Sequence, residues 1–202
     1  MSDIPLVLIA GISCSGKTTL ADQLAFRLGA TKVSIDDYYY GFDSLSDEEK
    51  QAVNFDDPSA IEHGLLLQHL RQLIRGEAVD MPKYDHETFS RSHRPSLVQP
   101  GPAVIVEGLF ALVWDELVSL TPTRIFVETR PEVAFQRRFM RDTVAFHRDP
   151  AAVLARHQAQ VVPCQDTIVL PSRSRATMVV SGEEPLDGSV QKIAEALIHL
   201  KR

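Results

Sequence analysis

Short apolar runs alternate with segments of helical periodicity along most of the chain. Five runs have the length of strands: 6–10, 31–35, 103–108, 123–129 and 176–180. Apolar residues recur at helical spacing in five other segments, which we predict as helices: 17–29, 59–75, 131–147, 150–162 and from about 188 onward. Nearly continuous apolar strands separated by helices are typical of a parallel sheet covered on both faces. The pattern therefore predicts an α/β fold, in which Pro163 limits the helix at 150–162.

The stretch 77–100 interrupts this rhythm. It is polar and contains Pro82, Pro95 and Pro100. We predict a small hairpin or lid here, inserted before the strand at 103–108. The sequence shows no repeats, low-complexity segments or interdomain linker, which predicts a single domain over residues 1–202.

The composition is that of an ordinary globular protein, with 202 residues of which 44% are hydrophobic. Asp and Glu number 27 against 21 Lys and Arg, and the net charge of -6 argues against bulk binding of nucleic acid or of an anionic membrane. Cys14 and Cys164 are too few for a disulfide framework. The apolar N-terminal run lacks the basic flank of a signal peptide, and no run reaches transmembrane length. We therefore predict a cytoplasmic protein.

The stretch GISCSGKTT, residues 11–19, matches the phosphate-binding pattern G-x-x-x-x-G-K-[ST] between a predicted strand and a predicted helix. In such a loop, backbone N–H groups converge on phosphate at a helix N-terminus. Lys17 would reach the β- and γ-phosphates, and the Thr18 hydroxyl would bind Mg²⁺. The residues assigned to nucleotide binding are Gly11, Ser13, Cys14, Ser15, Gly16, Lys17, Thr18 and Thr19. The alternative to a phosphate loop is an ordinary glycine-rich turn. The complete motif in this context predicts a P-loop NTPase-type three-layer fold.

Carboxylates at strand ends are the candidates for chemistry on an acceptor, because the guanine-reading [NT]-K-x-D motif of a switch GTPase is absent from this sequence. Asp36 and Asp37 follow the strand at 31–35, and Glu107 ends another strand. In a parallel sheet these ends face the ligand crevice, so Asp36 could accept a proton from an acceptor hydroxyl. We predict Mg²⁺ ligation by Thr18, Glu107 and Asp36. The alternatives are a turn cap for one aspartate and a solvated Glu107.

The chain resembles the uridine kinase family of P-loop phosphotransferases over most of its length. Its motifs occur in the family's order: GISCSGKTT, SIDDYY, NFDDPSA, MPKYD, VEGLFAL, IFVET, RRFMRD and LPSRSRATMVV. The resemblance implies that Asp36 is the general base toward the ribose 5′-hydroxyl. It also implies that Asp56 binds the ribose 2′- and 3′-hydroxyls. By the same resemblance, Tyr84 and Asp85 line the nucleoside pocket and Glu107 is associated with the metal.

An arginine stripe follows the strand at 123–129. Arg138, Arg141 and Arg148 are spaced by three and seven residues, so they would project from one side of a helix. Guanidinium groups suit a transferring phosphoryl group, and we predict an arginine-bearing lid over about 137–160. Arg138 and Arg141 would act in catalysis, Arg138 also on the substrate, and Arg148 on the nucleotide. The alternative is a solvated charged face.

Several positions depart from the family's pattern. Phe146 and His147 stand where the family has Arg-Gly, and Arg156 stands where it has glutamine. The histidine that contacts the base in the family is replaced by Phe89, with His86 nearby. We assign Phe89 and His86 to the substrate pocket, where an altered residue would change which base is accepted.

These features predict an enzyme that uses ATP (or GTP) and Mg²⁺ to phosphorylate the 5′-hydroxyl of a uridine- or cytidine-like nucleoside. One alternative is a P-loop kinase of another small alcohol, such as nicotinamide riboside, pantothenate or a sugar phosphate. A second alternative is a nucleotide sensor without catalytic activity. The expected partner is the small molecule, with neither nucleic acid nor membrane, and a homo-oligomer is left open.

Overall fold

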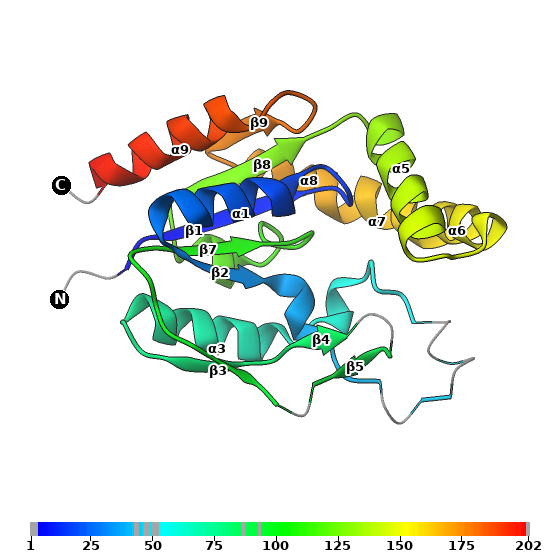
Figure 1. The fold of residues 1–202 in the computed structure, drawn as a ribbon, viewed down its shortest axis with the longest axis horizontal. Coiled ribbons are helices and arrows are strands. Elements are labelled where there is room, and N and C mark those ends of the chain that lie inside the picture. Colours follow the sequence, from blue (N-terminus) through cyan, green and yellow to red (C-terminus); the bar gives the residue numbers. More distant parts are fainter. Residues whose placement is uncertain are drawn as a thin grey trace.

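Five parallel strands form the central sheet of the protein, which we describe from a computed structural model (Figure 1). The strands are β1 (Leu6–Gly11), β2 (Thr31–Ser34), β7 (Val104–Glu107), β8 (Arg124–Glu128) and β9 (Met178–Ser181). Their order across the sheet is β2-β7-β1-β8-β9, and every neighbouring pair is parallel. All residues of the central strand β1 are buried, as its apolar sequence predicts. The structure describes residues 4–200 except 43–44, 47–48, 50–52, 86–87 and 93.

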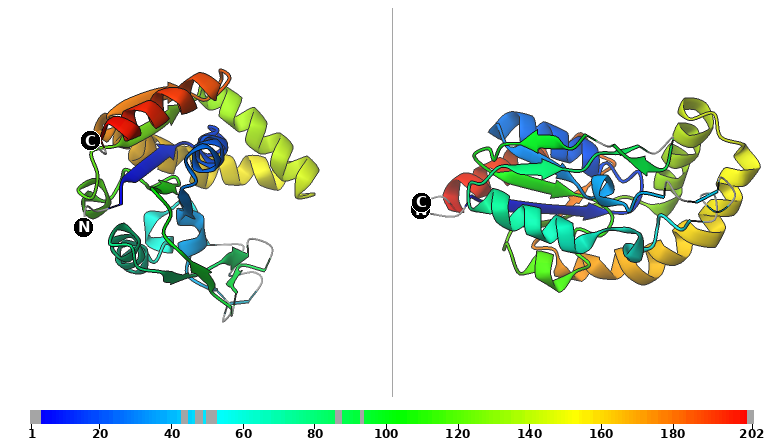
Figure 2. Two further views of the ribbon diagram at one scale, coloured as in Figure 1. Left: turned by 60° about the vertical axis from the view of Figure 1, so that its left-hand side comes forward. Right: turned by 90° about the horizontal axis from the view of Figure 1, so that it is seen from below.

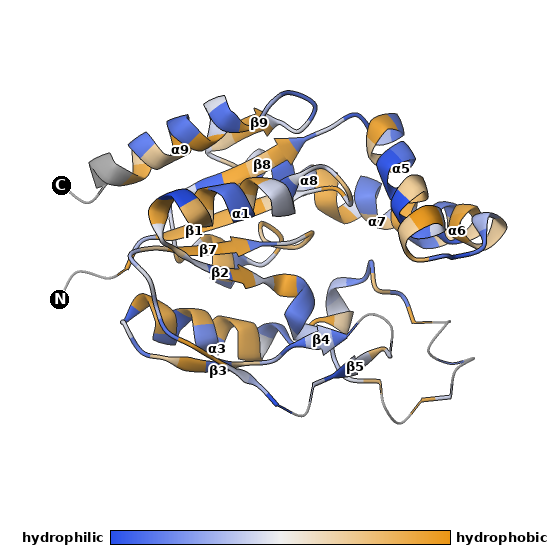
Figure 3. Ribbon diagram, in the orientation of Figure 1, coloured by the Kyte–Doolittle hydropathy of each residue, from blue (hydrophilic) through white to orange (hydrophobic). Residues whose placement is uncertain are grey.

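Alternate side chains of β1 enter two separate apolar clusters, one on each face of the sheet. Leu8 belongs to the larger cluster, whereas Val7 and Ile9 belong to the smaller one. Figure 3 shows the strands and the sheet-facing sides of the helices as apolar. Both faces of the sheet are therefore covered, which gives the hydrophobic core on each side.

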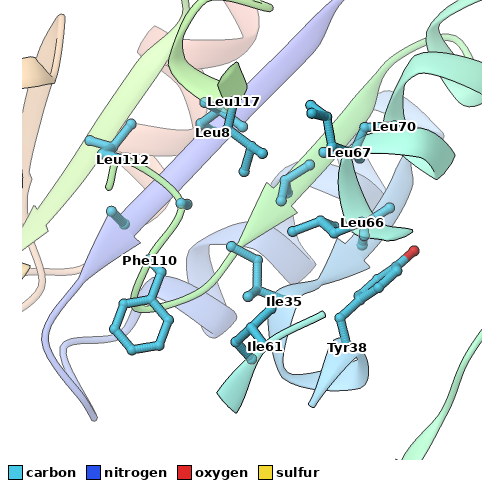
Figure 4. Close-up of a cluster of buried hydrophobic side chains, with 14 of the residues drawn as sticks. Leu8, Ile35, Tyr38, Ile61, Leu66, Leu67, Leu70, Phe110, Leu112 and Leu117 are labelled. Carbon is cyan, nitrogen blue, oxygen red and sulfur yellow. The ribbon is translucent and has the colours of Figure 1, made fainter. Parts of the chain in front are cut away.

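Helices α1 (Lys17–Leu28) and α9 (Asp187–Leu200) cover the smaller cluster. Helices α3 (His63–Ile74) and α4 (Asp115–Val118) lie on the opposite face. Figure 4 shows side chains from α3 and from the loops after β2 and β7 meeting Leu8 of β1 there. This arrangement confirms the predicted three-layer α/β fold.

The chain between 131 and 175 is more helical than the sequence predicts. Its segments are α5 (Pro131–Met140), a π-helical turn (Arg141–Ala145), α6 (Pro150–Arg156), a second π turn (His157–Val161), α7 (Val162–Cys164), a third π turn (Gln165–Val169), α8 (Leu170–Ser172) and a 3₁₀ turn (Arg173–Arg175). The run from 150 onward curves around one end of the sheet (Figure 2).

The prediction that Pro163 limits the helix at 150–162 is wrong. Pro163 stands in the first turn of α7, directly after a π turn, and Pro171 stands in the same way in α8. A proline is tolerated in a first helical turn because its missing N–H is not needed there. The wider π turns thus let the helical run continue past both prolines.

The stretch 77–100 forms two small antiparallel pairs. Strand β3 (Val79–Met81) pairs with β6 (Ser96–Val98), and β4 (Tyr84–Asp85) pairs with β5 (Ser90–Arg91). Strands β4 and β5 lie toward the end of the molecule that also carries α5 and α6 (Figure 1).

The predicted helix at 59–75 is interrupted near its start. A 3₁₀ turn, η2 (Pro58–Ala60), precedes α3, and between them Ile61 pairs with Tyr39 in an isolated bridge. Tertiary pairing with Tyr39 thus breaks a run that the spacing alone predicts as one helix. Among the described residues, none of the helices has the length and apolar character needed to cross a bilayer.

Candidate active site

The phosphate loop connects the central strand β1 to helix α1. Gly16 precedes the helix with φ 99°, a left-handed conformation that favours glycine. Within the described residues, no side chain caps the N-terminus of α1. Its first N–H groups and the positive end of the helix dipole are therefore suited to an anionic ligand. Lys17, the first residue of α1, is 9% exposed.

Two neighbouring elements support the phosphate loop from outside. Thr129, directly after β8, donates its hydroxyl hydrogen bond to the Ser15 carbonyl at 2.9 Å. Arg137 of α5 donates to the carbonyl of Gly182, the residue after β9, at 2.9 Å and to that of Cys14 at 3.5 Å. The loop conformation therefore depends on the ends of β8 and β9 as well as on its own glycines.

A buried carboxylate lies beside the loop. Glu107, the last residue of β7, is 3% exposed and accepts hydrogen bonds from the hydroxyls of Thr18 and Ser34, both at 3.0 Å. These contacts bring together residues from α1, β2 and β7 that the sheet order makes neighbours. The result is a small group of oxygen atoms at the start of α1.

A cavity of about 200 Å³ opens between the phosphate loop, the segment after β2 and the helical run that begins with α5. Ser13 from the loop and Asp36 from the 3₁₀ helix η1 (Ile35–Tyr38) both line it. Asp56, which is 5% exposed, lines it from another side. Two carboxylates and the phosphate loop thus share one cavity.

Aromatic rings form one wall of this cavity. Tyr39, Phe55 and Phe89 line it, and the Phe55 ring centroid lies 5.2 Å from that of Tyr39 and 5.4 Å from that of Phe89. The Tyr39 hydroxyl donates to the Phe55 carbonyl at 2.6 Å. Burial, followed by the charge of Asp36, raises the pKa of Tyr39 well above its usual value, so this hydroxyl stays protonated.

Arg156 borders the aromatic wall. Its guanidinium carbon lies 5.5 Å from the Phe55 ring centroid, and its N–H groups donate to the Val53 carbonyl at 2.9 Å and to Gln160 at 3.0 Å. Burial lowers the pKa of Arg156 from its usual value, and the Asp56 charge opposes this change. A guanidinium is not deprotonated in proteins, so the side chain remains a cation.

Three further arginines line the cavity and surround one carboxylate. The side chain of Asp142 is 3% exposed and forms ion pairs with Arg138 at 3.5 Å, Arg141 at 2.8 Å and Arg148 at 3.7 Å. Arg138 also approaches Asp56 at 3.7 Å. An acidic chain therefore concentrates positive charge at the cavity.

The structure places many of the predicted site residues together. Those that line the cavity are Ser13, Asp36, Asp56, Phe89, Arg138, Arg141 and Arg148. Tyr84 is buried behind the wall, where its ring lies 5.3 Å from that of Tyr39, and Asp85 is exposed on β4. His86 lies outside the described residues.

Some residues of the cavity were absent from the predicted set. Tyr39 and Phe55 lie within the motifs SIDDYY and NFDDPSA, so their position next to Asp36 and Asp56 was an available signal. Asp142, which contacts three arginines of the cavity, stands four residues after Arg138, a spacing that allows an ion pair on one helix. Leu109 gave no comparable signal, because an apolar residue after a strand is ordinarily part of the core.

A family model described as "Phosphoribulokinase / Uridine kinase family" matches residues 6–184. The uridine kinase of Chloroflexus aurantiacus is 33% identical over 186 residues, which cover 90% of this chain and 89% of that protein. The uridine kinase of Vibrio cholerae is 34% identical over 182 residues, 87% of this chain and 85% of that protein.

Solved structures show the same fold at lower sequence identity. The chain is similar to a "putative fructose transport system kinase" from Silicibacter, with a TM-score of 0.74 and 21% identity over 89% of this chain and 91% of that one. It is also similar to phosphoribulokinase from Rhodobacter spheroides, with a TM-score of 0.64 and 15% identity over 90% of this chain and 71% of that one.

Proposed function

Because the chain belongs to the phosphoribulokinase/uridine kinase family and is therefore an ATP-dependent kinase, we propose that it phosphorylates the 5′-hydroxyl of a nucleoside with the help of Mg²⁺. One observation carries the proposal most directly. Two carboxylates, Asp36 and Asp56, line a single cavity together with an aromatic wall and Ser13 of the phosphate loop. These are the groups that phosphoryl transfer to a riboside needs.

The residues beside the phosphate loop fit a magnesium ion. Mg²⁺ prefers oxygen ligands and is usually held by one or two protein groups together with water and substrate phosphates. The Thr18 hydroxyl and the Glu107 carboxylate, 3.0 Å apart, supply such oxygens, and Ser34 holds the other oxygen of Glu107. When bound, the ion would offset the charge that develops on the β- and γ-phosphates.

Asp36 is proposed to take the proton from the acceptor hydroxyl. It follows β2 at the carboxyl edge of the sheet and lines the cavity together with Ser13 of the phosphate loop. Asp56 is proposed to accept hydrogen bonds from the vicinal hydroxyls of the ribose, since an ionised carboxylate offers acceptors on both oxygens. Lys17 would reach the transferring phosphoryl group from the loop.

The aromatic wall of Tyr39, Phe55 and Phe89 would receive the base. A flat apolar wall stacks against any base, and it contributes no hydrogen bond that tells one base from another. The preferred nucleoside then depends on polar groups at the border of this wall, among which Arg156 can only donate hydrogen bonds and cannot accept them.

The decisive experiment measures ADP release with a panel of acceptors. The panel contains uridine, cytidine, adenosine, nicotinamide riboside, pantothenate, fructose and a sugar phosphate, with ATP and Mg²⁺ throughout. We expect turnover with at least one riboside. Turnover only with a different alcohol would replace the nucleoside in the proposal, and no turnover with any acceptor would favour a nucleotide sensor.

The variant Asp36→Asn tests the catalytic assignment in the same assay. Its amide keeps the shape but cannot take the proton, so kcat should fall about a hundredfold or more while ATP binding is retained. Asp37→Asn is the matched control, because Asp37 accepts from the Tyr84 N–H at 3.3 Å and the amide oxygen can still do so. An increase in acceptor KM without a loss of kcat in Asp36→Asn would make Asp36 a binding residue only.

A further inference from the structure

One buried carboxylate connects three of the four arginines that line the cavity. Arg141 directs both Nε and Nη2 to Oδ1 of Asp142, at 2.9 and 2.8 Å. Arg138 and Arg148 approach the other oxygen, Oδ2, at 3.5 and 3.7 Å. Each carboxylate oxygen therefore has its own cationic partners.

The main chain of Asp142 strengthens the same arrangement. The N–H of Arg148 donates to the Asp142 carbonyl at 2.9 Å, which closes the turn between α5 and α6. Arg148 is thus tied to Asp142 by its backbone and by its side chain. Because the Asp142 side chain is only 3% exposed, this anchor is shielded from solvent and from salt.

The Phe146 ring contacts two of the guanidinium groups. The guanidinium carbons of Arg141 and Arg148 lie 5.5 and 5.4 Å from its ring centroid, within the range of cation–π contacts. Three cations gathered around one cavity repel one another. The ring and the carboxylate together offset this repulsion.

We propose that Asp142 is a positioning residue which, together with the Phe146 ring, holds Arg138, Arg141 and Arg148 as a preassembled clamp for the transferring phosphoryl group. The inference rests on the proposed phosphoryl transfer. A guanidinium has five N–H donors, and each contact with Asp142 uses one or two of its nitrogens, so donors remain for phosphate. Donors that are already oriented stabilise developing charge without reorganisation during the reaction.

A purely stabilising role is a weaker explanation of this cluster. Burying charges is costly, and buried ion pairs often contribute little net stability compared with apolar residues. All three arginines, however, line the cavity that also contains Asp36 and Asp56. An anchor that orients them toward this cavity explains why a carboxylate is buried at this position.

The experiment compares Asp142→Asn with the unmodified enzyme. The amide keeps the shape and removes the charge, so we expect kcat to fall about tenfold or more, with the acceptor KM within about twofold and a cooperative melting transition retained. Asp166→Asn is the matched control, since Asp166 is likewise the second residue of a π turn but is exposed, and it should leave kcat unchanged.

A double variant distinguishes positioning from a structural role. If Asp142 acts through Arg148, then Asp142→Asn should lower kcat by a clearly smaller factor in an Arg148→Ala background than in the unmodified enzyme. The inference would be overturned if the fall in kcat of the double variant equalled the product of the two single falls, or if Asp142→Asn left kcat unchanged. Should Asp142→Asn fail to fold, Phe146→Leu tests the same clamp at a residue that is about half exposed. Its kcat should fall severalfold, and an unchanged kcat would overturn the inference.

Failure of the proposed function has a different signature. It would be seen in the unmodified protein, as no turnover with any acceptor. The clamp would then be assessed by titration with ATP, where Asp142→Asn should weaken binding relative to Asp166→Asn. Equal affinities of the two variants would overturn the inference independently of catalysis.

Discussion

Phe89 shows how one residue can set the selectivity of the cavity. It lines the aromatic wall with φ 55°, a left-handed conformation that is rare for residues other than glycine. Its carbonyl accepts from the Phe42 N–H at 3.1 Å, which helps to hold this conformation. A phenyl ring at this position can stack on a base but cannot form a hydrogen bond with its edge.

The prediction concerns Phe89→His. Histidine is among the residues enriched at positive φ, so the backbone should accept it, and its ring adds a donor and an acceptor at the wall. We expect the kcat/KM for pyrimidine ribosides to rise relative to other ribosides, because hydrogen-bonding sites discriminate more strongly than apolar ones. Phe89→Leu is the control without a hydrogen bond. Equal changes in kcat/KM for both variants would contradict the prediction.

At the scale of elements, the phosphate loop depends on the end of β9. Gly182 lies so close to the loop that a Cβ atom at this position would be 1.9 Å from the Ser15 carbonyl oxygen and 2.4 Å from Thr129 Oγ1. The strand order β2-β7-β1-β8-β9 separates β9 from β1 by one strand, and the loop bridges that distance. The nucleotide site is therefore built from both halves of the sequence.

Gly182→Ala should consequently weaken the nucleotide site. The added methyl must displace backbone, so we expect a loss of about 1–3 kcal/mol in the free energy of unfolding and weaker ATP binding. Gly188→Ala, in α9, is the control because nothing lies within 4 Å of its Cβ position. Chemical denaturation and ATP titration measure both quantities, and equal behaviour of the two variants would show that the loop tolerates the displacement.

At the scale of the whole molecule, ligand binding and stability are linked. The phosphate loop, the ends of β7, β8 and β9 and the helical run all contribute to one site, so nucleotide binding should stabilise the whole fold. At a ligand concentration of about 100 times Kd, the free energy of unfolding increases by about 2.7 kcal/mol. For a domain of this length that corresponds to a rise in Tm of roughly 5–10 °C.

Lys17→Ala should remove most of this rise in Tm with ATP and Mg²⁺, and it should abolish turnover. The control is Lys32→Ala, which loses an exposed ion pair with Asp22; neither residue lines the cavity, so this variant should keep the full rise in Tm. Thermal melting with and without nucleotide measures the difference. An undiminished shift in Lys17→Ala would show that the loop lysine contributes little to binding.

The sequence by itself determined the features that local spacing encodes. The apolar period identified the five strands of the sheet and most of the helices, and the glycine pattern located the phosphate loop between β1 and α1. The positions of Asp36 and Glu107 at strand ends placed both at the ligand edge, because parallel strands expose their carboxyl ends together.

Only the tertiary structure decided which distant residues meet. Pairing of Ile61 with Tyr39 interrupts a helix that its spacing predicts, and π turns carry the chain past Pro163. The buried Glu107 likewise meets Thr18 and Ser34, which are 89 and 73 residues away in the sequence. Periodicity reports only whether a residue faces the core, whereas the partners of a buried charge such as Glu107 are set by the packing of elements far apart in the chain.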